Sequence, residues 1–375
     1  MMIKKTICAL LLAGLLPLAS MAQDSTQFIK ASWNELLAKA KKEKKPIFVD
    51  TYFEGCHACK DMEVRVFPSK DVKQYMLDNF INTGFDVFKE EFGNDLCARY
   101  MLHGFPTYLV ISPEGKLVSM DLGYHDADVF LKFLKEAIAR YKTGKFHDGF
   151  ATTIAKEGPQ WYQQFYSKSR EFPKDSIVRD FLAKQKDKKA EMTVKAMALC
   201  RSLPADYRAY YLANRQSYKD LFGIDVNTGI LDNIMKKDML ELPSKYDEAA
   251  FNEFLKKHET EYAAGGDWDK IKMDFAMMFM VRNNKNAKAF IEFSIANQDK
   301  NENNARVLPF YNYEAFKDPE VTELYLKWVR TLVNEGSSLE LLSSLAQRTK
   351  EKYPEESKKY AAWASAKAAV MGMSK

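Results

Sequence analysis

The stretch KKPIFVDTYFEGCHACKDMEV, residues 44–64, joins a short apolar run to two closely spaced cysteines. Residues 47–53 are largely apolar and partly β-branched, which predicts a buried strand. A helix that begins at the Cys56 turn would carry Cys59 one turn further along. The N-terminus of a helix lowers the pKa of a thiol, and the thiolate is the reactive form. We therefore expect Cys56 to be an exposed nucleophile and Cys59 a more buried thiol that resolves a mixed disulfide.

Two other roles are open to this Cys-x-x-Cys pair, namely a structural disulfide and one half of a zinc site. A zinc site would need two further ligands, and the sequence contains no second Cys-x-x-Cys. His57 and His103 could in principle complete such a site, although neither spacing is diagnostic. The position of the pair, between a predicted strand and a predicted helix, favours redox activity.

Two further features are placed to serve the cysteines. Asp50 lies in the middle of the apolar strand, where a carboxylate is costly unless it has a task. If burial raises its pKa, the Asp50 carboxylate could accept the proton of Cys59. The alternative interpretation is that Asp50 is a carboxylate at the end of the strand whose side chain reaches solvent. Phe105-Pro106-Thr107 follows a predicted helix and opens a predicted strand. An ordinary trans proline would suit this place, and a cis proline would set backbone groups beside the cysteines.

The remaining chemically active residues have less specific patterns. As a cation, His57 would stabilise the Cys56 thiolate and make the disulfide more oxidising, and the alternative is an exposed spacer. Cys97 and Cys200 each lie in a predicted helix among apolar residues. Single buried cysteines usually behave as small hydrophobic residues, which is the role that we expect for both.

The elements around the motif alternate between helix and strand and end in a hairpin. Helical periodicity and β-branched runs predict the order α-β-α-β-α-β-β-α. The predicted helices are 31–45, one that starts at residue 56 and runs through 66, one that ends at 96–101, and 126–141; the predicted strands are 47–53, 79–87, 107–111 and 117–122. Ser112-Pro113-Glu114-Gly115 supplies turn-forming residues between the last two strands.

These residues resemble the thioredoxin superfamily over roughly residues 27–145. The matching features are Asp50, the Cys56-x-x-Cys59 pair, Phe105-Pro106-Thr107 and the order of the elements. Trp33 at the start of a helix, KKPIFVD and the later GYHDADVFLKFLKEA are most similar to the branch that includes the periplasmic domain of transmembrane thiol:disulfide interchange proteins.

The resemblance implies an α/β thioredoxin fold, in which helices flank a central mixed sheet. It also implies roles for four residues: Cys56 as nucleophile, Cys59 as resolving cysteine, Asp50 as proton acceptor and Pro106 as a cis proline. The chain departs from the family at Gly55, where a Trp is usual, and at His57-Ala58, where Gly-Pro is common. Both departures leave the redox potential, and with it the direction of electron flow, open.

Strand signals nearly vanish after residue 146. Apolar and aromatic residues recur at helical spacings up to the C-terminus, and prolines and glycines break this region into about ten helices. We expect an all-α domain at 146–375, either a solenoid of paired helices or a compact irregular bundle. No fixed repeat is present. This part lies outside the resemblance.

The N-terminus carries the pattern of a secretory signal. Lys4 and Lys5 precede an apolar run at 6–18, and small residues follow, which predicts a signal peptide at 1–22 with cleavage after Ala22. An uncleaved anchor is the alternative, but the run is short for a spanning helix, which needs about 20 residues. The mature chain would begin with a thioredoxin-like domain at 23–145. Export, most simply to the periplasm and alternatively to the medium, would bring the cysteines into an oxidising compartment.

Composition narrows the class of function. The 56 basic and 51 acidic residues give a net charge of only +5, which argues against a nucleic-acid binder. We expect an exported thiol:disulfide oxidoreductase without a bound cofactor or metal, with protein thiols and disulfides as substrates, a redox partner protein, and reduction as the preferred direction. No stable membrane insertion is expected after cleavage, and the oligomeric state is open. The rivals are a non-catalytic scaffold whose helical domain docks a partner, and a peroxide-reducing enzyme that uses one cysteine.

Overall fold

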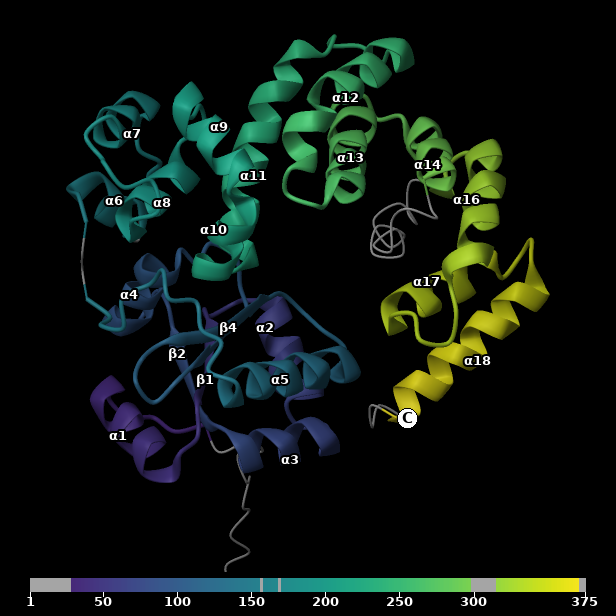
Figure 1. Ribbon diagram of the computed structural model, residues 1–375. Helices are drawn as coiled ribbons and strands as arrows, with labels where there is room; N and C mark the ends of the chain where they lie inside the picture. Colours follow the sequence, from purple (N-terminus) through teal and green to yellow (C-terminus); the bar gives the residue numbers. More distant parts are fainter. Residues whose placement is uncertain (1–27, 156–157, 168–169, 298–314, 371–375) are drawn as a thin grey trace, which may run out of the picture.

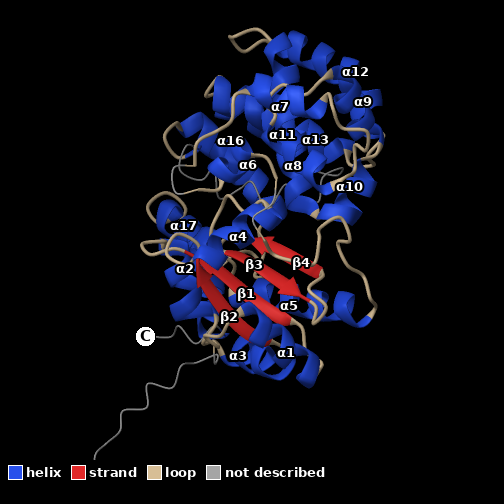
Figure 2. Cartoon of the chain, turned by 90° about the vertical axis from the view of Figure 1, so that its left-hand side faces the viewer, coloured by secondary structure: helices blue, strands red, loops and turns tan. Residues whose placement is uncertain are grey.

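The computed structural model describes residues 28–155, 158–167, 170–297 and 315–370 (Figure 1). The predicted signal peptide at 1–22 lies outside these residues. An α/β unit comes first along the chain, and a helical region follows it and arches over one side of the sheet (Figures 1 and 2). Within the described ranges, none of the helices combines the length and apolar character required to cross a membrane.

The α/β unit is built on a mixed sheet of four strands in the order β2-β1-β3-β4. The strands are β1 (Ile47–Tyr52), β2 (Ile81–Asp86), β3 (Thr107–Ile111) and β4 (Leu117–Leu122). β1 runs parallel to β2 and antiparallel to β3, and β3 and β4 form the hairpin that the sequence predicted. The register pairs Asp50 with Gly84 on one side and with Tyr108 on the other.

Helices cover both faces of this sheet. One face packs against α1 (Trp33–Glu43) and α4 (Glu91–Tyr100); the other packs against the π-helix η1 (Met62–Val66), α3 (Lys70–Asn79) and α5 (Ala127–Lys142). Successive residues of β1 alternate between the two cores, since Ile47 and Val49 face the first and Phe48 the second. This period of two turns Asp50 toward the second face.

One predicted strand boundary is wrong. The helix predicted from residue 56 through 66 is confirmed, because α2 (His57–Asp61) runs directly into η1, but the strand predicted from residue 79 begins later, after a separate helix α3 that the sequence did not predict. Pro68 has no N–H to continue the hydrogen-bond ladder, so the chain turns there and α3 begins anew after Ser69. Asn79 is the last residue of α3, and β2 therefore starts at Ile81.

The helical region contains twelve α-helices among its described residues, where the sequence predicted about ten. Some breaks carry neither Pro nor Gly; Asn214, for example, separates α9 from α10. The elements are α6 (Gln160–Phe165), α7 (Asp175–Leu182), α8 (Glu191–Leu199), α9 (Ala205–Ala213), α10 (Arg215–Phe222), α11 (Ile224–Asp238), η2 (Met239–Glu241), α12 (Glu248–Ala263), α13 (Trp268–Ala276), η3 (Met277–Asn283), α14 (Ala287–Ala296), α16 (Pro319–Leu332), α17 (Leu339–Thr349) and α18 (Pro354–Val370).

The beginning of the helical region is fused to the α/β unit through a shared core. Tyr162 of α6 donates its hydroxyl to the Ala98 carbonyl of α4 at 2.5 Å. The buried guanidinium of Arg99 bonds Glu191 of α8 and the Thr153 carbonyl, both at 2.6 Å. Apolar residues of both parts, including those around these bonds, form one continuous cluster. The two parts are therefore held by a buried interface at this end.

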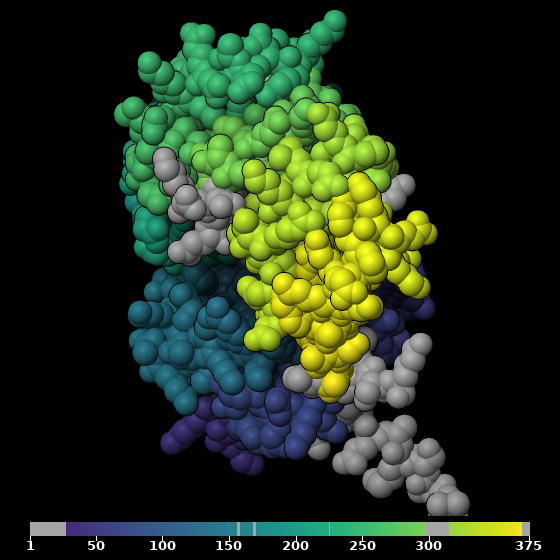
Figure 3. All heavy atoms as spheres, turned by 90° about the vertical axis from the view of Figure 1, so that its right-hand side faces the viewer, coloured from purple at the N-terminus to yellow at the C-terminus, as the bar shows by residue number. Residues whose placement is uncertain are grey.

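The far end of the arch returns to the α/β unit. The Leu339 N–H at the start of α17 donates to the Asp126 carboxylate at 3.1 Å, and the Leu339 side chain packs against the second core. Lys367 of α18 lies 3.2 Å from the Asp128 carboxylate and 3.8 Å from that of Asp126. Figure 3 shows these C-terminal helices lying against the α/β unit. The chain thus makes a second, smaller and more polar contact close to the N-terminus of α5.

Candidate active site

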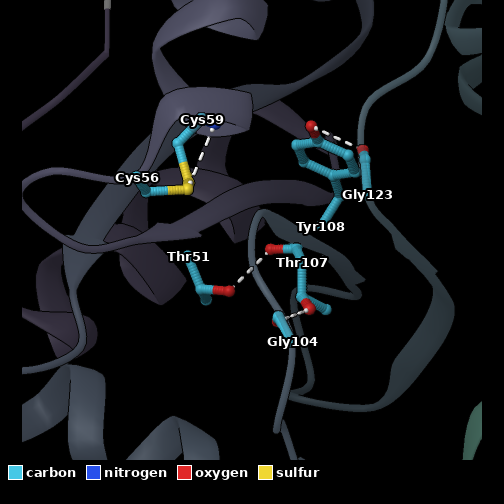
Figure 4. Close-up of a disulfide and its surroundings, with 7 residues drawn as sticks. All are labelled: Thr51, Cys56, Cys59, Gly104, Thr107, Tyr108 and Gly123. Carbon is cyan, nitrogen blue, oxygen red and sulfur yellow. Dashed lines mark hydrogen bonds between the residues drawn. A yellow bond between two sulfur atoms is a disulfide. The ribbon is translucent and has the colours of Figure 1, made fainter.

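Cys56 and Cys59 form a disulfide where β1 gives way to α2 (Figure 4). Cys56 is the N-cap residue of α2, with extended backbone, and its Sγ accepts a hydrogen bond from the Cys59 N–H at 3.2 Å. The Cys56 N–H in turn donates to the Phe53 carbonyl at 3.2 Å, which fixes the turn from strand to helix. The sequence prediction of a strand, a turn and a helix start at this motif is confirmed.

The predicted difference in exposure between the two cysteines is wrong for this disulfide form. Cys56 is 8% exposed and Cys59 is 7% exposed, so both are buried. The physical reason is the short disulfide loop, because the bond folds the Cys56 sulfur back over the first turn of α2, where it meets the Cys59 N–H. The sequence could not predict that the Cys56 sulfur is buried, because it gives the order of the two cysteines but not the direction in which the disulfide bond turns the sulfur.

Gly55 explains why the chain departs from the usual Trp before the first cysteine. Its φ is +90°, in the left-handed region that side chains disfavour and glycine adopts at no steric cost. A Cβ added at this position would meet nothing within 4 Å. The requirement for glycine is therefore conformational, and the space in front of Cys56 is left free of a bulky side chain.

Asp50 is buried beneath the helical layer that carries the cysteines. Its residue is only 9% exposed, and its Oδ1 accepts no hydrogen bond within the described part of the chain. Burial raises the pKa of this carboxyl to about 7; the charge of Glu63 adds to the shift, and Lys30 opposes it. η1 continues α2 directly and packs on the sheet face that Asp50 shares with Phe48 and Tyr108. The prediction of a buried carboxyl in the strand is confirmed, and the alternative of a solvent-exposed one is not.

Pro106 lies at the start of β3, and its peptide bond with Phe105 is cis, the form that the resemblance implied. The Pro106 carbonyl accepts the Gly123 N–H at 2.8 Å. Two bonds of 2.7 Å hold Thr107: its carbonyl accepts the Thr51 hydroxyl, and its own hydroxyl donates to Gly104. Figure 4 shows Thr51, Thr107 and Gly104 on the side of the disulfide where β1 and β3 meet. The loop that holds the cis proline is thus fixed to β1 and to the end of β4 by backbone and hydroxyl bonds.

Comparison with known proteins finds a family for the part of the chain that holds the disulfide. Residues 33–138 match the family model of the thioredoxin-like domain. This part of the chain is a thioredoxin-like domain. A solution structure of a thioredoxin from Thermus thermophilus is 25% identical to it, over 29% of this chain and 85% of that one, with a TM-score of 0.27. No curated protein matches the sequence. The helical region lies outside the matched residues.

The thioredoxin-like domain also carries an aromatic cluster that the sequence did not reveal. The rings of Phe53, Phe88 and Phe105 lie with centroids 5.4 to 6.3 Å apart, and Phe88 is partly exposed. Phe53 precedes Cys56 by three residues and Phe105 precedes the cis proline, so the cluster borders both halves of the site. The three rings come from separate segments, and no sequence spacing connects them.

His57 and His103 are exposed, whereas the two cysteines outside the disulfide, Cys97 and Cys200, are buried. His57 is exposed beside Cys56, and exposed His103 is held to its own loop by the Met101 carbonyl, 3.1 Å from Nδ1. Over the described ranges, no three His, Cys, Asp or Glu side chains gather into a metal-binding group. Cys97 and Cys200 are buried free thiols, and burial raises the pKa of each to about 11. Both have the core environment that the sequence predicted.

Proposed function

We propose that this protein is an exported thiol:disulfide oxidoreductase that reduces disulfides in protein substrates through Cys56 and Cys59. The observation that carries the proposal is the disulfide between the two cysteines at the start of α2 in a thioredoxin-like domain. Export, and a periplasmic or secreted location, are supported by the signal-like pattern of residues 1–22.

The exchange proceeds in two balanced steps. In the first, the Cys56 thiolate attacks one sulfur of a substrate disulfide, forms a mixed disulfide and releases the other substrate sulfur as a thiolate. In the second, the Cys59 thiolate attacks the Cys56 sulfur, restores the Cys56–Cys59 disulfide and releases the second substrate thiolate. Two electrons pass from the dithiol to the substrate, and the substrate thiolates take protons from solvent. A redox partner protein regenerates the dithiol by the same exchange, so no bound cofactor is required.

Asp50 is the proposed proton acceptor for Cys59. With a pKa of about 7, its carboxyl is poised to change its protonation state near neutral pH, and its Oδ1 has no competing donor among the described residues. Loss of the Cys59 proton to Asp50 would turn the resolving thiol into a nucleophile at the moment when the mixed disulfide has formed.

The remaining site residues shape the approach of the substrate. Phe105, Pro106 and Thr107 are the proposed wall opposite the cysteines, and the bonds of Thr107 to Thr51 and Gly104 would hold this wall in place. His57 is exposed next to the nucleophile, where a positive charge would stabilise the Cys56 thiolate and make the disulfide more oxidising. Reduction of substrates is the preferred direction, from the branch of the superfamily that the sequence resembles.

The deciding measurement is the reduction potential of the Cys56–Cys59 pair. The protein is equilibrated in glutathione or dithiothreitol buffers, quenched, and its free thiols are tagged and counted by mass. A value of about −270 mV would support a reductase, and about −120 mV would instead make the protein an oxidant of exported thiols. The Cys56→Ser variant, which cannot form the pair, is the control for Cys97 and Cys200. Absence of any reversible two-electron couple would overturn the redox function and favour the scaffold alternative.

A further inference from the structure

A cavity of about 500 Å³ lies between the thioredoxin-like domain and the helical region. Its floor comes from the segment that leads into β3 and from β4, and includes Gly104, Thr107 and Leu122. Its roof comes from α8 and α11, and includes Leu199, Val226 and Gly229. The volume falls in the range of ligand pockets, and the lining is mostly apolar. Figure 2 shows the sheet edge below and the helices of this region above.

The cavity is continuous with the wall of the active site. Gly104 and Thr107 line it, and they flank the cis peptide bond between Phe105 and Pro106 on either side. The Thr107 carbonyl accepts the Thr51 hydroxyl from the strand that leads to Cys56. A chain segment that runs along residues 104–107 would therefore pass both the cis peptide bond and the cavity.

Gly229 keeps the roof of the cavity open. It lies in the interior of α11, where glycine destabilises a helix relative to alanine. Neither of the usual reasons for glycine applies, because its φ is not in the left-handed region and a Cβ would meet nothing within 4 Å. The absent side chain is explained instead by the space that it leaves in the cavity.

The mouth of the cavity is aromatic and positively charged. Phe172, 53% exposed, borders it, and the Arg201 guanidinium lies 4.9 Å from the centre of that ring. The Arg201 guanidinium thus contacts the ring face, while the Arg201 backbone N–H donates to the Asp175 carboxylate at 2.9 Å. Lys236 is the second cation at the mouth, and Asp232 lies 4.0 Å from it. The exposed Arg201 guanidinium at an apolar opening would complement an acidic group on the occupant.

We propose that this cavity binds a large apolar side chain of an extended substrate segment, next to the cysteine under attack, with an acidic residue of the same segment at Arg201. The proposal rests on the thiol:disulfide exchange proposed above and adds the class of sequence that the enzyme selects. Selectivity would arise where the helical region meets the thioredoxin-like domain, so it would be a property of the two parts together.

The test uses full-length reduced protein and synthetic peptides. Each peptide contains one cysteine in a mixed disulfide with thionitrobenzoate, which is coloured when the Cys56 thiolate displaces it. Leucine is moved in turn through the positions around the cysteine of a serine-rich parent peptide, with glutamate or lysine at the distal end. We expect at least one leucine position to react roughly tenfold faster than the parent, and glutamate to be preferred over lysine.

Gly229→Trp fills the cavity, and Gly229→Ala is its matched control, since alanine favours the helix but leaves most of the space. Gly229→Trp should abolish the preference for leucine, Gly229→Ala should keep it, and both should react with free Ellman's reagent at the wild-type rate. Gly229→Leu, with a smaller side chain, serves if the tryptophan variant does not fold. Arg201→Glu, on an exposed side chain, should reverse the preference from glutamate to lysine.

The outcomes separate the two proposals. Equal rates for all leucine positions, or an unchanged preference in Gly229→Trp, would overturn the cavity proposal while leaving the exchange activity intact. Failure of the wild-type dithiol to react even with Ellman's reagent would overturn the exchange activity itself.

Discussion

Asp50 places an ionisable group on a sheet face that is otherwise covered by apolar side chains. Burial is the first cause of its raised pKa, and Glu63 reinforces the shift from the surface of η1. The folded protein therefore holds the proton of this carboxyl up to about pH 7, whereas the unfolded chain releases it near the ordinary value of 3.8. The contribution of Asp50 to folding is complete below the lower of these two values and is lost as the pH rises through the upper one.

We expect Asp50→Asn to stabilise the oxidised protein at high pH. The variant and the wild type should have similar free energies of unfolding at pH 4, because both side chains are then neutral in the folded state. The difference in free energy of unfolding between the variant and the wild type should grow between pH 4 and 7 and reach about 4 kcal/mol above pH 7. Urea titrations at several pH values would measure it. A gap that stays constant with pH would contradict the raised pKa of Asp50.

At the scale of elements, the sequence predicted the strands and their bounds best where an apolar run is followed by residues that form a turn. The strands at 107–111 and 117–122 were predicted with their observed bounds, because two largely apolar runs flank a turn with its own signature. Asp50 could be predicted as buried from its apolar neighbours in the strand. Neither the cluster of Phe53, Phe88 and Phe105 nor the cavity could be predicted from the sequence. The pattern of an amphipathic helix or strand shows that one of its faces is buried, but it does not show which other element covers that face.

The joint between α4 and the helical region yields a prediction at this scale. Arg99 is 1% exposed and bonds both Glu191 and the Thr153 carbonyl, so Arg99→Met removes two bonds from a buried interface. Breaking a buried pair by removing one partner costs about 3 kcal/mol, although Lys195 still pairs with Glu191 here. We expect a loss of about 2 to 3 kcal/mol in urea denaturation.

The matched control for this substitution is Lys39→Met. Lys39 pairs with Glu43 on the exposed side of α1, and surface pairs contribute little, so the change should stay within about 0.5 kcal/mol of the wild type. Equal effects of the two substitutions would show that the interface around Arg99 does not hold the two parts together.

At the scale of the whole molecule, the helical region touches the thioredoxin-like domain at both of its ends. The contact near α6 and α8 is a continuous apolar core with buried bonds, whereas the contact at α17 and α18 depends on Leu339 and on Lys367 with Asp126 and Asp128. Charged contacts weaken with salt, while apolar burial does not. The two ends therefore differ in strength and in what disrupts them.

We expect Lys367→Ala to loosen the C-terminal end alone. Amide hydrogen exchange in α17 and α18 should become faster, and exchange in α6 and α8 should stay at the wild-type rate. Lys358→Ala is the matched control, because Lys358 lies on the same helix and pairs with Glu355 on the exposed surface. Unchanged exchange in α17 after removal of Lys367 would contradict a stabilising role for this contact.

The unequal contacts make the helical arch behave as a hinged arm with a latch. The apolar joint at α4 is the hinge, and the ion pairs beside Asp126 are the latch. Release of the latch would free α17 and α18 from the N-terminal end of α5. The cavity beneath α8 and α11 lies on the hinge side and would keep its shape throughout. The contact at the C-terminal end should therefore weaken as ionic strength rises, while the apolar part of the cavity should not change.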